Sequence, residues 1–168
     1  MFAPHKATFR SRRGAALVEL AIVLVVLMLL VTGIMEFGLM FRNYLDVGQS
    51  VSAGCRSAAL GSGTSVVGSR ITSTLTALGL NTQYSTSTVL QYRTYNKLTG
   101  VWTGWQTLGN APSGYNNAPS DATYDSQIKI TMVYTYPLAT GAFLSPIIGQ
   151  NGNVRLSGTC VMRREQTP

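Results

Sequence analysis

The residues that can carry chemistry are few in this chain and lie far apart. Its single histidine, His5, lies in a basic segment near the N-terminus, and its two cysteines are Cys55 and Cys160. This spacing fits neither a zinc site nor a CxxC redox pair, and the sequence holds no GxSxG or Walker motif. We therefore expect no enzymatic activity, no metal and no cofactor.

Carboxylates are equally sparse. The six acidic residues are Glu19, Glu36, Asp46, Asp121, Asp125 and Glu165. Outside the apolar N-terminal segment, Asp121 and Asp125 are the pair that a hydrolase or a calcium site would use. Charges at the edge of a loop are more often simply solvated, and we expect this of both. We also expect Glu36 to be a solvated charge at the outer boundary of a membrane.

Glu19 is the charge in the least expected place. It lies within residues 15–35, where 18 of 21 residues are apolar and the exceptions are Glu19, Thr32 and Gly33. About 20 such residues in a helix cross the hydrocarbon core of a bilayer. Because an ionised side chain there costs about 2.5–3.5 kcal/mol, Glu19 needs either an oppositely charged partner or a position from which it reaches water at the inner surface.

Basic residues precede the apolar run and predict its orientation. Lys6, Arg10, Arg12 and Arg13 are four of the 13 Lys and Arg residues, and no acidic residue lies among them. The positive-inside rule places this end in the cytoplasm and the rest of the chain outside it. Because the excess of positive charge is concentrated here, the basic composition does not indicate a nucleic-acid-binding surface, and we expect no nucleic-acid partner.

Three hypotheses account for the N-terminal segment: a cleaved secretory signal, a plain signal anchor, or the leader of a pilin-like protein. A secretory signal would end in a small-x-small cleavage site, whereas residues 31–50 continue in a helical pattern. A plain anchor explains the length of the apolar run but gives no reason for Glu19.

The motif around Gly14 separates these hypotheses. The basic leader, Gly14 and the sequence AALVEL that begins at Ala15 resemble the processing site of type IV-pilin-like proteins. A small first residue is similar to the TadE-like (TadE/TadF) pseudopilins of tight-adherence (Flp) pilus systems, whereas type IVa pilins are expected to have phenylalanine where Ala15 stands. The resemblance implies that a prepilin peptidase cleaves between Gly14 and Ala15. It also implies that Glu19 pairs with the new N-terminus of a neighbouring subunit and sets the register between helices.

The same resemblance implies the role and the location of the protein. It predicts a minor pseudopilin with a structural role in assembly, held in the bacterial inner membrane by one span with the C-terminus outside the cytoplasm, or incorporated in a pilus. Its partners would be the lipid bilayer, the prepilin peptidase, and other pilins or pseudopilins through the N-terminal helix. The alternatives are an uncleaved bitopic anchor that displays a small extracytoplasmic binding domain, and a subunit of a type IV pilus or type II secretion system.

Periodicity predicts a long helix that extends past the membrane. We expect a leader at 1–14, one helix over 15–60 whose first part (about 15–36) spans the bilayer, and an exported α+β head at 61–168. Beyond the membrane, apolar residues recur at steps of three and four and predict one buried stripe. These are Phe37, Met40, Phe41, Tyr44, Leu45, Val47, Val51, Cys55, Ala58 and Ala59. A short second helix is expected from Thr64 or Ser65 to about Leu78.

From about residue 87 the pattern alternates and predicts strands. Residues 89–95 and 101–108 should form a hairpin around a turn that ends in Gly100, and residues 127–136 and 154–162 should form two further strands. Residues 109–123 and 139–153 are expected to be loops. Together these elements predict a pilin-like α+β fold with an antiparallel sheet of about four strands. Trp102 and Trp105, three positions apart, are expected on opposite strand faces.

The two cysteines fall in parts of the chain that the predicted topology places outside the cytoplasm, where oxidation is possible. Cys55 belongs to the predicted long helix and Cys160 to the last predicted strand. A disulfide between them is one hypothesis, and two separate buried thiols are the other.

Overall fold

The structure is a computed structural model that describes residues 10–111, 115–138, 141 and 152–165, with side chains described from Gly14 onward except at 85 and 86. Most of the predicted leader and of the predicted loop at 139–153 lies outside the described residues. The chain forms two compact units, Met1–Leu39 and Met40–Pro168. A single helix, α1 (Arg10–Ala59), contributes to both.

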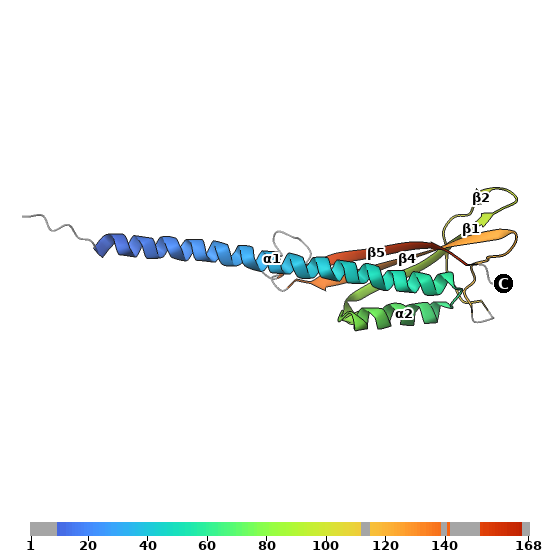
Figure 1. Ribbon diagram of the computed structural model, residues 1–168, viewed down its shortest axis with the longest axis horizontal. Coiled ribbons are helices and arrows are strands. Elements are labelled where there is room, and N and C mark those ends of the chain that lie inside the picture. The colour runs from blue at the N-terminus through green and yellow to red at the C-terminus, as the bar shows by residue number, and fades with distance from the viewer. Residues whose placement is uncertain (1–9, 112–114, 139–140, 142–151, 166–168) are drawn as a thin grey trace, which may run out of the picture. The chain divides into compact units, whose positions relative to one another are not determined.

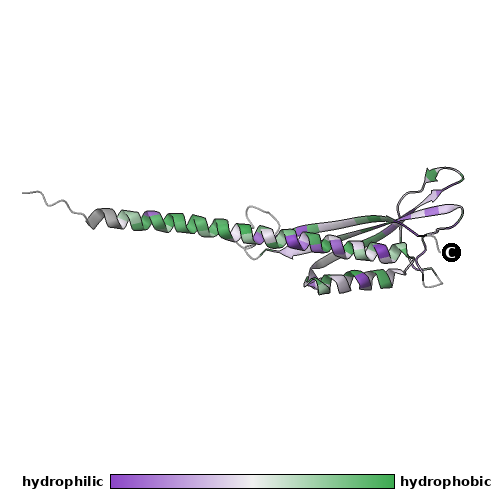
Figure 2. Cartoon of the chain, in the orientation of Figure 1, coloured by the Kyte–Doolittle hydropathy of each residue, from purple (hydrophilic) through white to green (hydrophobic). Residues whose placement is uncertain are grey.

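The first unit consists, in its described part, of the N-terminal portion of α1. The helix begins at Arg10, upstream of the predicted start at residue 15. We call its residues 14–39 the stem. From Leu17 to Val31 the large apolar side chains of the stem are 41–68% exposed, and Figure 2 shows this stretch as hydrophobic along almost its whole length. It is the one helix among the described residues that is long and apolar enough to cross a membrane.

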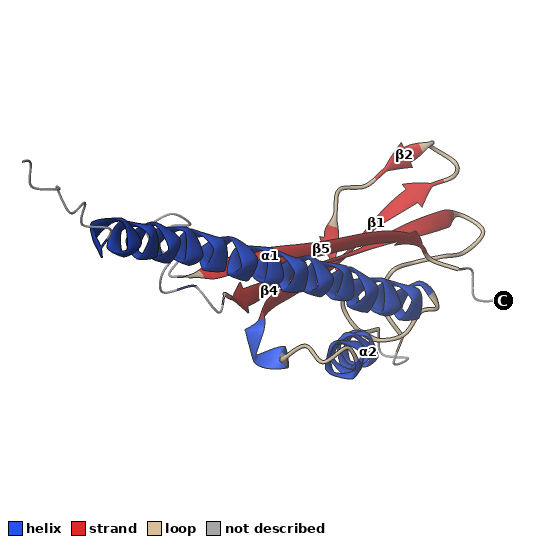
Figure 3. Cartoon of the chain, turned by 60° about the vertical axis from the view of Figure 1, so that its left-hand side comes forward, coloured by secondary structure: helices blue, strands red, loops and turns tan. Residues whose placement is uncertain are grey.

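The second unit is an α+β domain, as predicted. It contains the rest of α1, α2 (Thr64–Ala77), the 3-10 turn η1 (Thr82–Tyr84) and one antiparallel sheet (Figures 1 and 3). The strands are β1 (Ser85–Asn96), β2 (Val101–Trp102), β3 (Gln106–Thr107), β4 (Tyr124–Pro137) and β5 (Asn153–Arg163). The spatial order is β2-β1-β4-β5, and β3 also pairs with β1.

The core lies between the sheet and the two helices. From Ser126 to Tyr134 every second residue of β4 is buried, including Ile128, Ile130 and Met132. This confirms the predicted alternation, which arises because successive side chains of a strand point to opposite faces. Val67, Ile71 and Leu75 give α2 the matching buried face, so burial of apolar area holds both helices on the same side of the sheet.

The predicted hairpin forms, but its second strand is interrupted. Gly100 closes the turn at φ +71°, and the returning segment then pairs with β1 in two short pieces, β2 and β3. Between them the N–H of Thr94 donates to Oγ1 of Thr103 at 2.9 Å. Because a side chain takes the place of the next main-chain partner here, the ladder breaks, and the prediction of one strand over 101–108 was wrong.

Only part of the predicted buried stripe of α1 is buried. Val47, Val51, Cys55, Ala58 and Ala59 are buried, as expected. Four residues of the same set are exposed instead, namely Phe37 at 69%, Phe41 at 62%, Tyr44 at 49% and Leu45 at 48%. At 100° per residue, Phe37 lies on the same line of the helix as Cys55, and Phe41 on the same line as Ala59, each five turns later. Angular position therefore does not separate the exposed residues from the buried ones, which all lie further along α1. We call the four exposed residues the exposed stripe.

Two glycines set how closely α1 approaches its neighbours. A Cβ added at Gly54 would lie 2.4 Å from Cγ1 of Ile71 on α2, and one added at Gly158 on β5 would lie 3.1 Å from Cγ1 of Val47. Ile71 is itself only 3% exposed, so it has little room to move aside. The absence of a side chain at these positions therefore permits the packing of α1 against both α2 and the sheet.

We expect Gly54→Ala to lower the free energy of unfolding by about 1–3 kcal/mol, because an added methyl group overpacks this contact. The matched control is Gly48→Ala on the same helix, where nothing lies within 4 Å of an added Cβ. There the better helix propensity of alanine should raise stability by up to about 1 kcal/mol. Urea unfolding of the full chain in detergent, followed by tryptophan fluorescence, measures both. Equal stabilities of the two variants would contradict the close approach.

Candidate functional site

The residues predicted to take part in processing and assembly all lie on the first unit's part of α1. Gly14, Ala15 and Glu19 are helical and exposed. A Cβ added at Gly14 would meet nothing within 4 Å, so no packing within the chain requires glycine there. Glu19 lies about 7.5 Å further along the helix axis at 1.5 Å per residue.

The polar groups of the stem differ in how they are satisfied. Oγ1 of Thr32 donates to the carbonyl of Met28 at 2.8 Å, one helical turn earlier, so this hydroxyl brings no unpaired group into an apolar environment. Glu19 has no hydrogen bond or ion pair with any described residue. Within the stem, its carboxylate is therefore the group that calls for a partner from outside the described chain.

The apolar surface of the stem likewise has no cover among the described residues. Its large apolar side chains are 41–69% exposed, and in water such an apolar surface is strongly unfavourable. Two environments remove it from water: the acyl chains of a bilayer and the apolar faces of other helices.

Glu36 does not fit the prediction made for it. It is 7% exposed, so the expectation of a solvated charge at the membrane boundary was wrong. The sequence pattern places it one turn beyond Thr32 but says nothing about what covers that face, which is a property of the tertiary structure.

The two cysteines, far apart in the sequence, lie together in the second unit. Cys55 on α1 is fully buried, Cys160 on β5 is half-buried, and both are free thiols in the structure. Cys55 belongs to the buried core, Cys160 packs against that core, and Cys160 lies opposite Ile130 in the pairing of β4 with β5. Burial, reinforced by the neighbouring Cys160, raises the pKa of Cys55 well above its ordinary value, so this thiol stays protonated.

The acidic pair was predicted to be solvated, and this was wrong for Asp125. It lies at the start of β4, is 9% exposed, and pairs with Arg163 on β5 and with Nζ of Lys97 at 3.2 Å. The hydrogen bond from Arg163 is the main reason why the pKa of Asp125 lies below its ordinary value. Asp121 accepts the backbone N–H groups of Thr123 at 2.7 Å and Tyr124 at 2.8 Å. Asp125 therefore forms salt bridges, and Asp121 stabilises a turn.

The two tryptophans lie around one guanidinium group, not on opposite faces as predicted. The Arg93 guanidinium is 4.6 Å from the ring centre of Trp102 and 4.8 Å from that of Trp105, and Nζ of Lys129 is 4.8 Å from the Trp105 ring. Arg93 also donates to Oε1 of Gln127. The strand break at 103–105 allows this arrangement, and no sequence signal foretold it. Each indole thus already faces a cation of its own chain.

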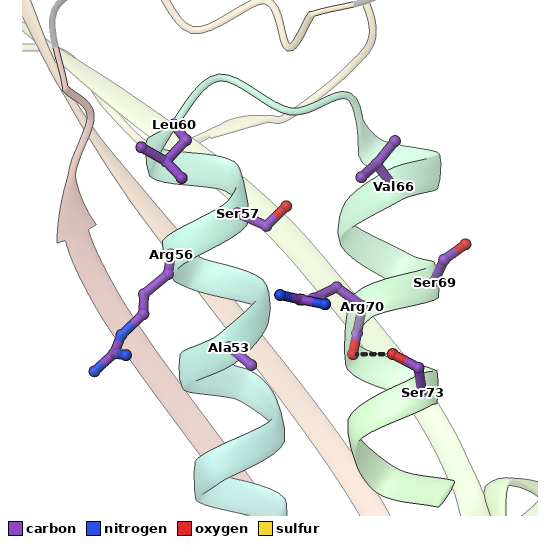
Figure 4. A pocket seen from close by; sticks show the side chains of 8 residues that line it. All are labelled: Ala53, Arg56, Ser57, Leu60, Val66, Ser69, Arg70 and Ser73. Atoms are coloured by element: carbon purple, nitrogen blue, oxygen red, sulfur yellow. Dashed lines mark hydrogen bonds between the residues drawn. The ribbon is translucent and has the colours of Figure 1, made fainter. Parts of the chain in front are cut away.

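A shallow groove lies between the end of α1 and α2 (Figure 4). Arg70 points toward α1 across the groove, whereas Arg56 extends from the other side of α1. Ser57, Ser69 and Ser73 supply hydroxyls, and the lining contains no carboxylate. Among the described residues there is also no group of three or more His, Cys, Asp or Glu side chains that can hold a metal. The groove therefore offers positive charge but no acid–base or nucleophilic set.

Comparison with known proteins finds a family match for the α1 segment. A family model described as TadE-like protein matches residues 14–56, which is the stem together with most of the part of α1 that packs in the second unit. This confirms the predicted resemblance to the TadE-like family over that segment of the chain. No curated protein and no solved structure matches the chain.

The Asp125 cluster makes stability depend on pH. Because the pKa of Asp125 is lowered in the folded state, its ion pairs stabilise the fold fully above the ordinary carboxyl pKa near 4. The contribution is lost as the pH falls through the lower folded value. We expect Asp125→Asn to reduce stability at neutral pH and to flatten the dependence on pH below about 4.

Asp121→Asn is the matched control for this prediction, since an amide oxygen accepts the same two backbone N–H groups. It should keep the acid sensitivity of the original chain. Thermal unfolding followed by circular dichroism between neutral and acidic pH compares the three proteins. An unchanged acid profile in Asp125→Asn would refute the role of this pair.

Proposed function

We propose that this chain is a minor pseudopilin of a tight-adherence pilus assembly or secretion system, with a structural role and no catalytic one. The observation that carries the proposal is the coincidence of the TadE-like match at residues 14–56 with a helix whose apolar surface no described residue covers. The protein would be held by this single helix in the inner membrane, with the second unit outside the cytoplasm. The basic residues before Gly14 support that orientation.

Processing by a prepilin peptidase after Gly14 is part of the proposal. The basic leader precedes the glycine, Ala15 follows it, and the family match begins at the glycine itself. Since an added Cβ at Gly14 would touch nothing, a requirement for glycine there is better explained by an enzyme that binds this peptide than by folding of the chain. Cleavage would create a free amino group at Ala15.

Glu19 would then bind the new N-terminus of a neighbouring subunit. Two opposite charges in an apolar medium cost less together than apart, so a carboxylate without a partner in its own described chain and a freed ammonium group fix the axial register of adjacent helices. Thr32 cannot serve this purpose, because its hydroxyl is already bonded within the helix.

The exposed stripe supports contact with other pilins or pseudopilins. Phe37, Phe41, Tyr44 and Leu45 continue the apolar surface of the helix beyond the residues that a bilayer is expected to cover. Aromatic and aliphatic side chains on one helix face are typical of surfaces that bind a second helix. We therefore propose that α1 provides both the membrane span and the surface for assembly.

Mass spectrometry of the protein extracted from membranes tests the processing step. In a host that contains the peptidase, we expect the mass to correspond to loss of residues 1–14, and we expect Gly14→Leu to keep the leader. Gly33→Ala is the control, because it also changes a stem glycine with open surroundings and should be cleaved normally. An intact leader on the unaltered chain would contradict the proposal and favour the uncleaved bitopic anchor.

Glu19→Ala tests the register. We expect this variant to insert into the membrane as before, since it removes a charge that opposes insertion. It should be lost at least tenfold from purified pili or assembly complexes, because its partner ammonium group is left unpaired. Thr32→Val is the control and should be incorporated normally. Both are measured by quantitative immunoblotting of membrane and assembly fractions, and normal incorporation of Glu19→Ala would refute the pairing.

A further inference from the structure

We propose that Cys55 and Cys160 form a modification site: a disulfide that joins α1 to β5, made by exchange with an external disulfide such as oxidised glutathione or a protein of the dithiol oxidoreductase class. Formation in the cell rests on the proposed function, because it requires the second unit to lie outside the cytoplasm. The reactivity of the pair itself depends only on the fold of the second unit.

The first support is the place of the two cysteines in the second unit. Cys55 is 0% exposed, and Cys160 packs against the buried cluster to which Cys55 and Ile130 belong. Cys160 also lies opposite Ile130 in the pairing of β4 with β5. One helix and two strands therefore hold the two cysteines in the same part of the core.

The second support is the close approach of helix and strand beside the pair. Gly158 lies two residues before Cys160, on the same face of β5, and a Cβ there would be 3.1 Å from Val47 and 3.2 Å from Val51. Val51 precedes Cys55 by one helical turn. The backbones of α1 and β5 thus come close where the two cysteines face each other, as a short covalent link requires.

Other roles for the pair are less well supported. Buried cysteines often act as small apolar core residues, but filling the core does not require the chain's two cysteines to lie in the same place. A structural zinc site needs four ligands, and no third His, Cys, Asp or Glu joins the pair within the part of the chain that the structure describes. Two cysteines on closely packed elements are the arrangement from which a disulfide forms.

Exposure predicts the order of the chemistry. Half-buried Cys160 first gives its proton to water. Its thiolate then attacks one sulfur of the external disulfide RSSR, and the S–S bond of RSSR breaks. The released RS⁻ takes up a proton. Fully buried Cys55 then transfers its proton to the departing RS group while its sulfur displaces that group from the mixed disulfide. The net change is two cysteine thiols plus RSSR to one Cys55–Cys160 disulfide plus two RSH. The cysteines are oxidised and the external disulfide is reduced.

Peptide mapping without reduction tests the site. The full chain is purified from membranes after blocking free thiols with an alkylating agent, and a second sample is reduced and then treated with oxidised glutathione. We expect a linked Cys55–Cys160 peptide in both, whose mass is lower by two hydrogen atoms than the sum of the reduced peptides. The reduced protein should unfold about 10 °C below the oxidised one.

Single variants test the order of attack without depending on the stability of the link. In Cys55→Ser, we expect oxidised glutathione to leave a mixed disulfide on Cys160. In Cys160→Ser, the buried Cys55 should react at least tenfold more slowly. Equal rates in the two variants, measured on protein whose circular dichroism matches the original, would overturn the proposed order.

Failure of this inference can be told apart from failure of the proposed function. If the thiols stay free even after treatment of the folded protein with oxidised glutathione, the site is refuted whatever the location of the protein. If the disulfide forms readily in that sample while the protein from cells carries two alkylated thiols, the site is supported, and the placement of the second unit outside the cytoplasm is contradicted.

Discussion

An apolar helical surface that the described chain does not cover imposes the main demand on this protein. From Leu17 to Val31 the large side chains of α1 are 41–68% exposed, although an ordinary helix of a globular domain buries such residues. The hydrophobic effect therefore requires a cover from outside, either lipid or other helices. In that environment an unpaired polar group is costly. The hydroxyl of Thr32 is hydrogen-bonded within the helix, whereas the carboxylate of Glu19 has no partner among the described residues.

The same helix has a different task in the second unit. There Val47, Val51 and Cys55 face the sheet, and the missing side chains of Gly54 and Gly158 let α1 lie close to α2 and to β5. Packing at this density leaves little freedom to the groups at the interface. The location of Cys55 and Cys160 in the same part of the core follows from that packing, and so does the requirement for small residues beside them.

Charge in the second unit is mostly confined to defined contacts. Asp125 joins Lys97 and Arg163, and Arg93 lies between Trp102 and Trp105. Both clusters lie around the hairpin end of the sheet, where β2 and β3 are short and supply few main-chain hydrogen bonds. Side-chain interactions here help to stabilise the hairpin, which a longer series of main-chain hydrogen bonds would otherwise do. The groove beside Arg56 and Arg70 has cations without an acidic lining residue.

The sequence by itself determined the elements whose signal is local. The long, nearly continuous apolar run defined the stem. Three- and four-residue steps defined α2, and alternation defined β4, because side-chain direction repeats with a fixed period in each kind of backbone. The motif from Gly14 to Glu19 also sufficed to indicate the resemblance to the TadE-like family. Which apolar residues of α1 are buried depended on the tertiary structure, as did the burial of Glu36 and Asp125, the meeting of both tryptophans with Arg93, and the packing of the two cysteines in one part of the core. Each of these features depends on how segments far apart in the sequence pack against each other. The periodicity within one segment does not encode the distance between that segment and another.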